Sequence, residues 1–210
     1  MKITVLGAGN MGSAFVKQLT RAGHQVSVTA RDSAKAAQVA AANPGAQAVP
    51  AAGSAAGADV VVLATSFADA TAALQAAGDL KGKVVVDITN PLTADYMGLT
   101  IGHSTSAAEE IAKAVPGAEV VKAFNTVFAQ VLAEGADFGN GRKVSVFVAG
   151  DSERARQTVA ALAESIGFQV VDAGGLKNAR YLEPLAGLNI YLGYGAGLGT
   201  GIAPTWIRKA

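Results

Sequence analysis

The sequence predicts an α/β fold: a doubly wound, mostly parallel sheet with a small helical part at the C-terminus. Short runs of β-branched and aliphatic residues recur along the chain, as in strands that are buried on both faces. Segments with apolar residues at helical spacing separate these runs, so strands and helices alternate. With 210 residues and 50% hydrophobic side chains, the chain is long enough to bury such a sheet.

The first half of the chain contains five expected strands and three expected helices. Asp32 or Ser33 can cap the second helix, and the run Asn43-Pro44-Gly45 ends it. The expected strands are residues 3–6, 25–29, a weak one at 46–49, 60–64 and 83–88, and the helices are 13–22, 34–42 and 67–77.

The second half continues the alternation after a loop at residues 93–103. Ser106 and Glu109 form the capping box of a helix that Pro116 stops, and Gly167 closes the last expected helix of the sheet region. The expected strands are 119–124, 143–149 and 168–172, and the helices are 106–114, 127–134 and one that runs from Asp151 or Ser152 to 166. We therefore expect one sheet domain over residues 1–173 and a helical segment over 174–210.

Residues 184–207 carry no charge, and the stretch is long enough to cross a bilayer. Its six glycines, its two prolines and Asn189 make it a poor isolated helix. We expect a buried C-terminal helix, or one packed against a second subunit, and no membrane span.

Composition excludes several classes of function. The 17 basic and 16 acidic residues give a net charge of +1, which provides no field for binding nucleic acid or an anionic membrane. The absence of cysteine excludes disulfides, thiolate metal sites and cysteine nucleophiles. Two histidines are too few for a histidine-rich metal site, so no metal is expected. No secretory signal is evident at the N-terminus, which makes the cytoplasm the expected compartment.

The segment GAGNMG matches the pattern G-x-G-x-x-G between the first strand and the first helix. Gly7 permits the tight turn, Gly9 leaves room for a pyrophosphate, and Gly12 lets helix and strand approach each other. The amides at the start of the helix can bind phosphate. The pattern therefore predicts a dinucleotide site in a Rossmann-type domain.

The end of the second strand distinguishes the two nicotinamide cofactors. A site for NAD has an acidic side chain there, whereas this chain has Ala30 and Arg31. The guanidinium suits a 2′-phosphate, and Lys35 one helical turn later adds positive charge. Asp32 could instead accept the ribose hydroxyls, but its position favours a helix cap. The sequence therefore favours NADP(H).

The other strand ends supply small, amide and hydroxyl side chains, at residues 64–67, 89–92 and 123–126. No acid, base or nucleophile stands out among them, and His103 is a weak candidate for a catalytic group. Hydride transfer between two stacked rings needs positioning and little proton chemistry from the protein, so this composition is compatible with it.

Several stretches together resemble the NADP oxidoreductase family that depends on the deazaflavin coenzyme F-420. They are GAGNMG, TAR with Lys35, VVDITNPL at 85–92, STSAAEEIA at 104–112, VVKAFNT at 120–126 and DAGGLKNARYLE at 172–183. The resemblance covers nearly the whole chain. It implies a Rossmann domain, NADPH at the glycine loop, and a C-terminal helical part that helps to form a homodimer.

The resemblance also assigns residues to parts of the cofactor. It implies that the pyrophosphate is lined by Ala8, Gly9, Asn10 and Met11, the 2′-phosphate by Ala30, Arg31 and Lys35, and the ribose and nicotinamide by Ser66, Asn90, Leu92 and Ala129. Two positions depart from the family: Ala30 replaces a serine, and Asn125 replaces the histidine that archaeal members carry at the acceptor site. The run KAFNT is also similar to the reductase domain of the six-transmembrane metalloreductases, which pass hydride from NADPH to a flavin.

These observations predict an NADPH-dependent oxidoreductase that transfers hydride to a flavin-like acceptor, either F-420 or FMN/FAD with possible onward reduction of ferric iron. Asn125, Val127 and the backbone after Asn90 would position the two rings. One alternative is an NADP(H)-binding sensor without turnover. Another is a reductase of a small carbonyl or imine compound, with His103 as its acid.

Overall fold

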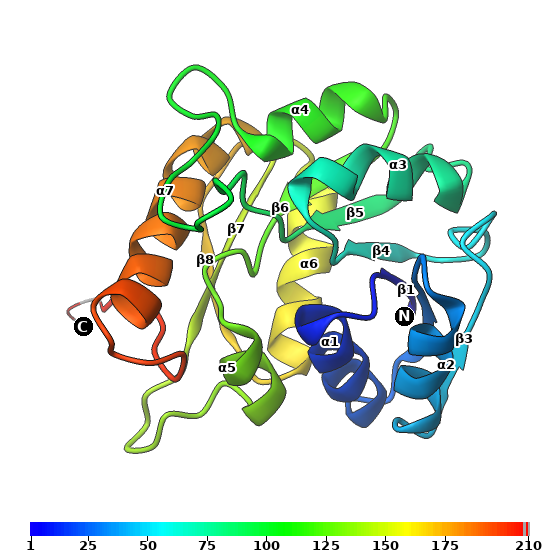
Figure 1. The fold of residues 1–210 in the computed structure, drawn as a ribbon, viewed down its shortest axis with the longest axis horizontal. Coiled ribbons are helices and arrows are strands. Elements are labelled where there is room, and N and C mark those ends of the chain that lie inside the picture. The colour runs from blue at the N-terminus through cyan, green and yellow to red at the C-terminus, as the bar shows by residue number, and fades with distance from the viewer. Residues whose placement is uncertain (208, 210) are drawn as a thin grey trace.

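The computed structural model describes residues 1–207 and 209, and in this part of the chain eight strands form one sheet (Figure 1). Their order across the sheet is β3-β2-β1-β4-β5-β6-β7-β8. The strands are β1 (Lys2–Leu6), β2 (Gln25–Thr29), β3 (Ala46–Ala48), β4 (Val60–Leu63), β5 (Val84–Asp87), β6 (Glu119–Lys122), β7 (Ser145–Gly150) and β8 (Gln169–Asp172).

The sheet is mostly parallel, as the sequence predicts. All neighbours from β3 to β6 pair in parallel, whereas β7 is antiparallel to β6 and carries β8 parallel to itself. The register aligns the last residues of five strands in one row, namely Thr29, Leu6, Leu63, Asp87 and Lys122. The loops that follow these strands therefore leave from one edge of the sheet. The strand order reverses between β1 and β4, which is where ligands bind in open α/β sheets.

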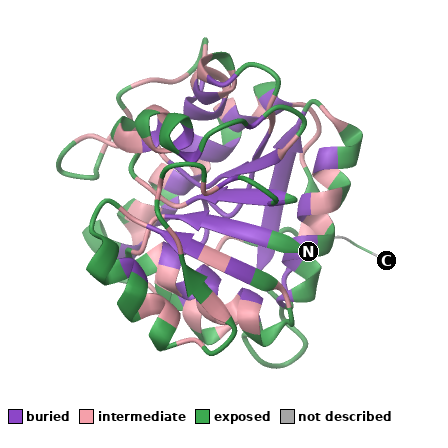
Figure 2. Ribbon diagram, turned by 90° about the vertical axis from the view of Figure 1, so that its right-hand side faces the viewer, coloured by how far each residue is buried: buried purple, intermediate pink, exposed green. Residues whose placement is uncertain are grey.

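Helices cover both faces of the sheet. One core cluster joins the sheet to α1 (Asn10–Arg21), α5 (Ala129–Glu134) and α6 (Glu153–Ser165), and side chains of α2 (Ser33–Ala41) pack at its margin. A second cluster on the opposite face includes α3 (Phe67–Ala77) and α4 (Ala107–Ala114), which lie above the sheet in Figure 1. Figure 2 shows the central strands buried between these layers, with exposed residues on the outer sides of the helices.

Helix starts follow the capping residues. Asp32, rather than Ser33, is the N-cap of α2 and accepts a hydrogen bond from the Ala34 amide at 3.0 Å, which confirms its role as a cap. Ser152 caps α6 in the same way. Helix α1 begins at Asn10, three residues before the expected start at residue 13. The last part of the glycine motif is already helical, but it lacks the apolar spacing from which a helix is predicted.

The C-terminal segment is more helical than its glycine content suggests. After a 3-10 turn (η1, Leu176–Asn178), α7 (Ala179–Ile190) packs on β7 through Leu182 and continues into a π-helical turn (η2, Tyr191–Gly195). None of the described helices is long and apolar enough to cross a membrane. The division of the chain at residue 173 stays a prediction.

Candidate functional site

The glycine motif forms the turn between β1 and α1. Gly7 has a φ of +122°, and a Cβ there would lie 2.2 Å from the Ala64 carbonyl oxygen at the end of β4. A Cβ on Gly12 would lie 1.9 Å from the Gly7 carbonyl oxygen. Gly9 differs, because a Cβ there would meet nothing within 4 Å. Two of the glycines therefore permit the turn to close, and the third leaves the outer side of the turn open.

Helix α1 presents unpaired amides at this turn. Its N-cap is Gly9, and no described side chain caps the helix. The first amides of a helix have no partner inside the helix, and the helix dipole places partial positive charge there. The open side of Gly9 and these amides fit a pyrophosphate group.

Arg31 stands at the end of β2 and reaches across to α3. Its Nη1 lies 3.1 Å from Oδ1 of Asp69, and its side chain is 87% exposed. Ser66 caps α3 and donates from its hydroxyl to the other Asp69 oxygen at 2.8 Å. An exposed ion pair thus joins the loop after β2 to the first turn of α3. Lys35 is also exposed, on the first turn of α2.

Asn90 and Asn125 pair with each other beyond β5 and β6. The Asn125 Nδ2 donates to the Asn90 Oδ1 at 3.0 Å, and the Asn90 Nδ2 donates to the Asn125 backbone carbonyl at 2.9 Å. The Asn125 Nδ2 also donates to the Leu182 carbonyl of α7 at 2.9 Å. Asn125 is 6% exposed, so the pair connects two strand ends and α7 within the protein.

The backbone before Asn125 is strained. Phe124 has a φ of +58°, in the left-handed region that side chains other than glycine rarely adopt. Its ring is fully buried and meets those of Phe15 and Phe168 edge-on, with centroids 5.0 and 5.7 Å away. Packing therefore holds a conformation that costs roughly 1–2 kcal/mol and turns the chain at the end of β6.

Three uncharged buried polar atoms near these strand ends have no hydrogen-bond partner in the described part of the chain: Thr89 Oγ1, Asn125 Oδ1 and Thr126 Oγ1. A fourth buried atom there, the charged Asp87 Oδ2, also lacks a hydrogen bond of good geometry but lies 2.7 Å from the Lys122 ammonium group. Unpaired buried polar atoms are rare and point to a missing partner. The amide oxygen of Asn125 matches the carboxamide N–H group of a nicotinamide. The donors at the α1 turn and this acceptor together fit a nicotinamide dinucleotide along the sheet edge.

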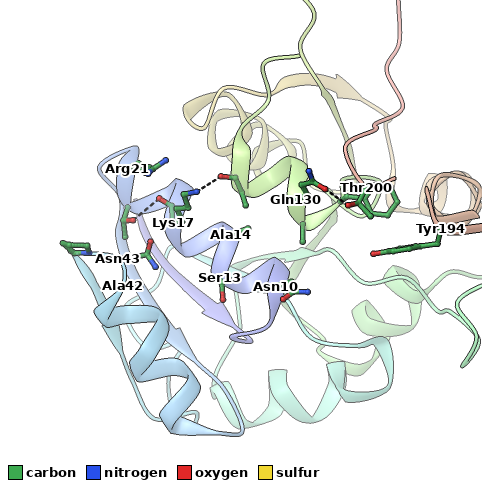
Figure 3. A pocket seen from close by; sticks show the side chains of 15 residues that line it. Asn10, Ser13, Ala14, Lys17, Arg21, Ala42, Asn43, Gln130, Tyr194 and Thr200 are labelled. Atoms are coloured by element: carbon green, nitrogen blue, oxygen red, sulfur yellow. Dashed lines mark hydrogen bonds between the residues drawn. The ribbon is translucent and has the colours of Figure 1, made fainter. Parts of the chain in front are cut away.

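A groove of about 770 Å³ runs along the outer side of α1 toward α5 and the C-terminal segment (Figure 3). Asn10 and Ala129 are the predicted cofactor residues in its lining. Phe128 and Tyr194 also line it, and their rings meet edge-on with centroids 5.7 Å apart. The far part, toward Arg21 and Asn43, lies away from the strand ends, so we do not assign the cofactor to the groove as a whole.

Three further predicted residues lie in the segments that follow β5 and β6. Val127 is buried after β6, and Leu92 forms an isolated bridge with Leu99 beyond β5. His103 is exposed on the loop before α4, with a φ of +56°. Its catalytic role stays a prediction.

Several residues that shape this edge carry no clear functional signal in the sequence. The spacing predicts only helix at Asp69 and only the end of a strand at Phe124. Asp87 and Lys122 each follow buried valines at the ends of β5 and β6, and both side chains are fully buried. A charge inside an apolar strand is the signal that could have marked them.

Comparisons with known proteins agree with the resemblance seen in the sequence. Residues 2–91 match the family model described as NADP oxidoreductase coenzyme F420-dependent. The F420-dependent NADP reductase of Methanothermobacter thermautotrophicus is 32% identical over 217 residues, which cover 91% of this chain and 89% of the relative. Metalloreductase STEAP3 of Rattus norvegicus is 30% identical over 185 residues, but the chain spans only 36% of that relative's length.

A solved structure supports the same assignment. The crystal structure of a candidate F420-dependent NADP-reductase from Arthrobacter sp. FB24 superposes with a TM-score of 0.88 at 35% identity and covers 99% of this chain and 100% of that one. The extent of the match to the reductase of Methanothermobacter thermautotrophicus decides the family, because it covers about nine tenths of both chains (91% of this chain and 89% of the reductase). The chain therefore belongs to the F420-dependent NADP oxidoreductase family and is an NADP-dependent oxidoreductase.

Proposed function

We propose that this protein transfers hydride between NADP(H) and a flavin-like acceptor, either the deazaflavin F-420 or FMN/FAD, from which electrons could pass on to ferric iron. The glycine turn at the switch point between β1 and β4 carries the proposal. Its open Gly9 and uncapped α1 supply a pyrophosphate site, and the orphaned amide oxygen of Asn125 supplies an acceptor for a nicotinamide carboxamide.

In this proposal each residue binds or orients, and none forms a covalent bond. The first amides of α1 hold the pyrophosphate, with Ala8, Asn10 and Met11 around it. The Arg31 guanidinium and Lys35 attract the 2′-phosphate, with Ala30 beside them.

A dihydronicotinamide held by these residues would supply a hydride, that is two electrons and a proton, to the acceptor ring, which would take up one further proton from solvent. Asn90 and Asn125 fix the plane of the donor ring, with Ser66, Leu92, Val127 and Ala129 around it. Positioning of this kind is the main contribution that a protein makes to hydride transfer.

The acceptor ring would bind at the end of the groove near Ala129. Phe128 and Tyr194 offer an aromatic wall there, and Tyr194 is 64% exposed. Aromatic walls suit flat, conjugated rings, because stacking adds to the apolar area that is buried. Replacing Tyr194 by alanine should raise KM for the acceptor several-fold and leave the Kd of NADPH unchanged.

The test is oxidation of NADPH by the purified protein with F-420, FMN and FAD offered separately. Turnover with F-420 alone would support the deazaflavin as acceptor, and turnover with FMN or FAD would support a flavin reductase. Tight NADPH binding with no turnover on any of the three would contradict the proposal.

We further propose that the protein acts in the cytoplasm as a homodimer. Tyr181, Leu188 and Tyr191 of the C-terminal helical segment are more than half exposed, and such large apolar side chains gather at interfaces. Light scattering tests the dimer, and Leu188→Glu should shift it toward monomer. Subcellular fractionation of the native host tests the compartment.

A further inference from the structure

A cluster of three charged side chains is buried between the sheet and α7. The side chain of Lys122, the last residue of β6, is fully buried. Its Nζ lies 2.7 Å from the Asp87 Oδ2 and 2.9 Å from the Glu183 Oε1. It also donates a hydrogen bond to the Thr89 carbonyl at 2.7 Å.

Stability alone does not account for this cluster. Removing charges from water costs so much that apolar side chains of similar size often stabilise a core as well or better. The cluster also contains two carboxylates for one ammonium group. Glu183 offsets part of this excess by accepting hydrogen bonds from the Ala107 and Ala108 amides at 2.9 and 3.2 Å, at the positive end of the α4 dipole.

The cluster lies next to both groups that hold the Asn125 side chain. Thr89, which accepts from Lys122, directly precedes Asn90. Glu183, which pairs with Lys122, directly follows Leu182. Asn90 Oδ1 and the Leu182 carbonyl are the two acceptors of the Asn125 Nδ2, so one ammonium group fixes the backbone on both sides of this carboxamide.

We propose that Lys122 is a positioning residue for hydride transfer: with Asp87 and Glu183 it sets the Asn90–Asn125 pair and thereby the plane of the nicotinamide. The inference rests on the proposed function. A flexible apolar side chain could fill the same volume, but it would not tie the loop after β5 to α7 by directional contacts. A reacting group displaced by about 1 Å can lose roughly a hundredfold in rate.

The test compares how the Lys122→Met variant and the wild type bind the adenosine end and the nicotinamide end of the cofactor. Binding of 2′,5′-ADP reports on the adenosine end, the change in NADPH fluorescence on binding reports on the nicotinamide, and single-turnover oxidation of NADPH reports on hydride transfer. The Kd of 2′,5′-ADP should stay within about twofold, whereas the fluorescence change should shrink and the hydride-transfer rate should fall by about tenfold or more.

Glu183→Gln provides a second variant, because Lys122→Met leaves two buried carboxylates without a cation and could unfold the protein. Its amide oxygen can still accept from the start of α4, while Asp87 and Lys122 remain a neutral pair. Glu183→Gln should also keep the Kd of 2′,5′-ADP and reduce the NADPH fluorescence change, with a smaller loss of hydride-transfer rate than Lys122→Met. Circular dichroism melting checks that each variant is folded.

Arg180→Met is the matched control. Arg180 also ties α7 to α4, since its Nε and Nη2 donate to the Glu109 carboxylate at 2.9 and 2.7 Å, and this contact holds the pKa of Glu109 below its usual range. Its hydrogen bonds and ion pair are with Glu109 and involve neither Thr89 nor Lys122, so both cofactor readouts should match the wild type.

Three outcomes would overturn the inference. One is an unchanged fluorescence signal and rate in folded Lys122→Met or Glu183→Gln. Another is an equal loss of 2′,5′-ADP binding, which would indicate a general structural role. The third is an equal effect of Arg180→Met. A wild-type protein that binds neither NADPH nor 2′,5′-ADP would refute the proposed function itself, and the inference with it.

Discussion

Replacing Arg31 by alanine should reveal whether this side chain recognises the 2′-phosphate. The guanidinium is 87% exposed and its Nη1 lies 3.1 Å from Asp69 in the free protein. A 2′-phosphate carries nearly two negative charges at neutral pH. At about 4 Å in water each unit charge contributes ~1 kcal/mol, so the attraction is about 2 kcal/mol.

Part of this attraction is offset in the free protein. An exposed ion pair such as Arg31–Asp69 contributes about 0.5 kcal/mol, which phosphate binding would weaken. The net loss in Arg31→Ala is therefore about 1.5 kcal/mol, or roughly a tenfold rise in the Kd of NADPH. NADH lacks the 2′-phosphate, so its Kd should change by less than about twofold.

Fluorescence titration with NADPH and NADH measures both constants, at low and at high salt. The NADPH effect should diminish toward roughly 1 M salt, where the Debye length falls to about 3 Å. Arg154→Ala is the control, since Arg154 also forms an exposed ion pair, with Glu119 at the opposite ends of the strands. Equal losses of affinity for NADPH and NADH in Arg31→Ala would show that Arg31 does not recognise the 2′-phosphate.

Asp69→Asn should lower the Kd of NADPH several-fold at low salt without affecting NADH, because it removes a negative charge beside the phosphate site; tighter binding of both cofactors would contradict this. Gly12→Ala should destabilise the fold by about 2 kcal/mol or more in thermal melts, since its Cβ would lie 1.9 Å from a backbone oxygen. Gly9→Ala should melt like the wild type, because its Cβ meets nothing within 4 Å, yet lose NADPH affinity; intact affinity would argue against a pyrophosphate at this turn. The pKa of His24 is lowered by burial and then by the nearby N-terminal amine, so the unfolded state takes up its proton more readily. Melting temperature should therefore drop as pH falls below the ordinary histidine pKa of 6.5, and His24→Asn should reduce that drop.

The strand and helix pattern is readable from the sequence because it depends on local spacing. Strands β4 and β5 are buried on both faces and consist mainly of valine, so their composition alone identifies them as strands. The glycine turn is equally readable, since its residues are consecutive and their steric reason is local. The role of Asp32 as a helix cap can also be predicted from the sequence, because the amide that it accepts from is only two residues away.

Contacts between the ends of different strands cannot be predicted from local sequence patterns. Arg31 and Asp69 are 38 residues apart in sequence, and Asn90 and Asn125 are 35 apart. Their pairing depends on the order and register of the strands, which no local pattern encodes. The left-handed backbone at Phe124 is hidden for the same reason, because packing against distant rings sustains it.

Three features can therefore be predicted from the amino-acid sequence, because each follows from residues close together in the chain: the fold class, the glycine turn and the positive charge at the end of β2. Other features emerge only when distant segments pack together: Lys122 is buried between two carboxylates, α7 carries the carbonyl that accepts from Asn125, and the last two strands run opposite to the others. These features depend on burial and on long-range pairing, and their energies arise only once the sheet has assembled.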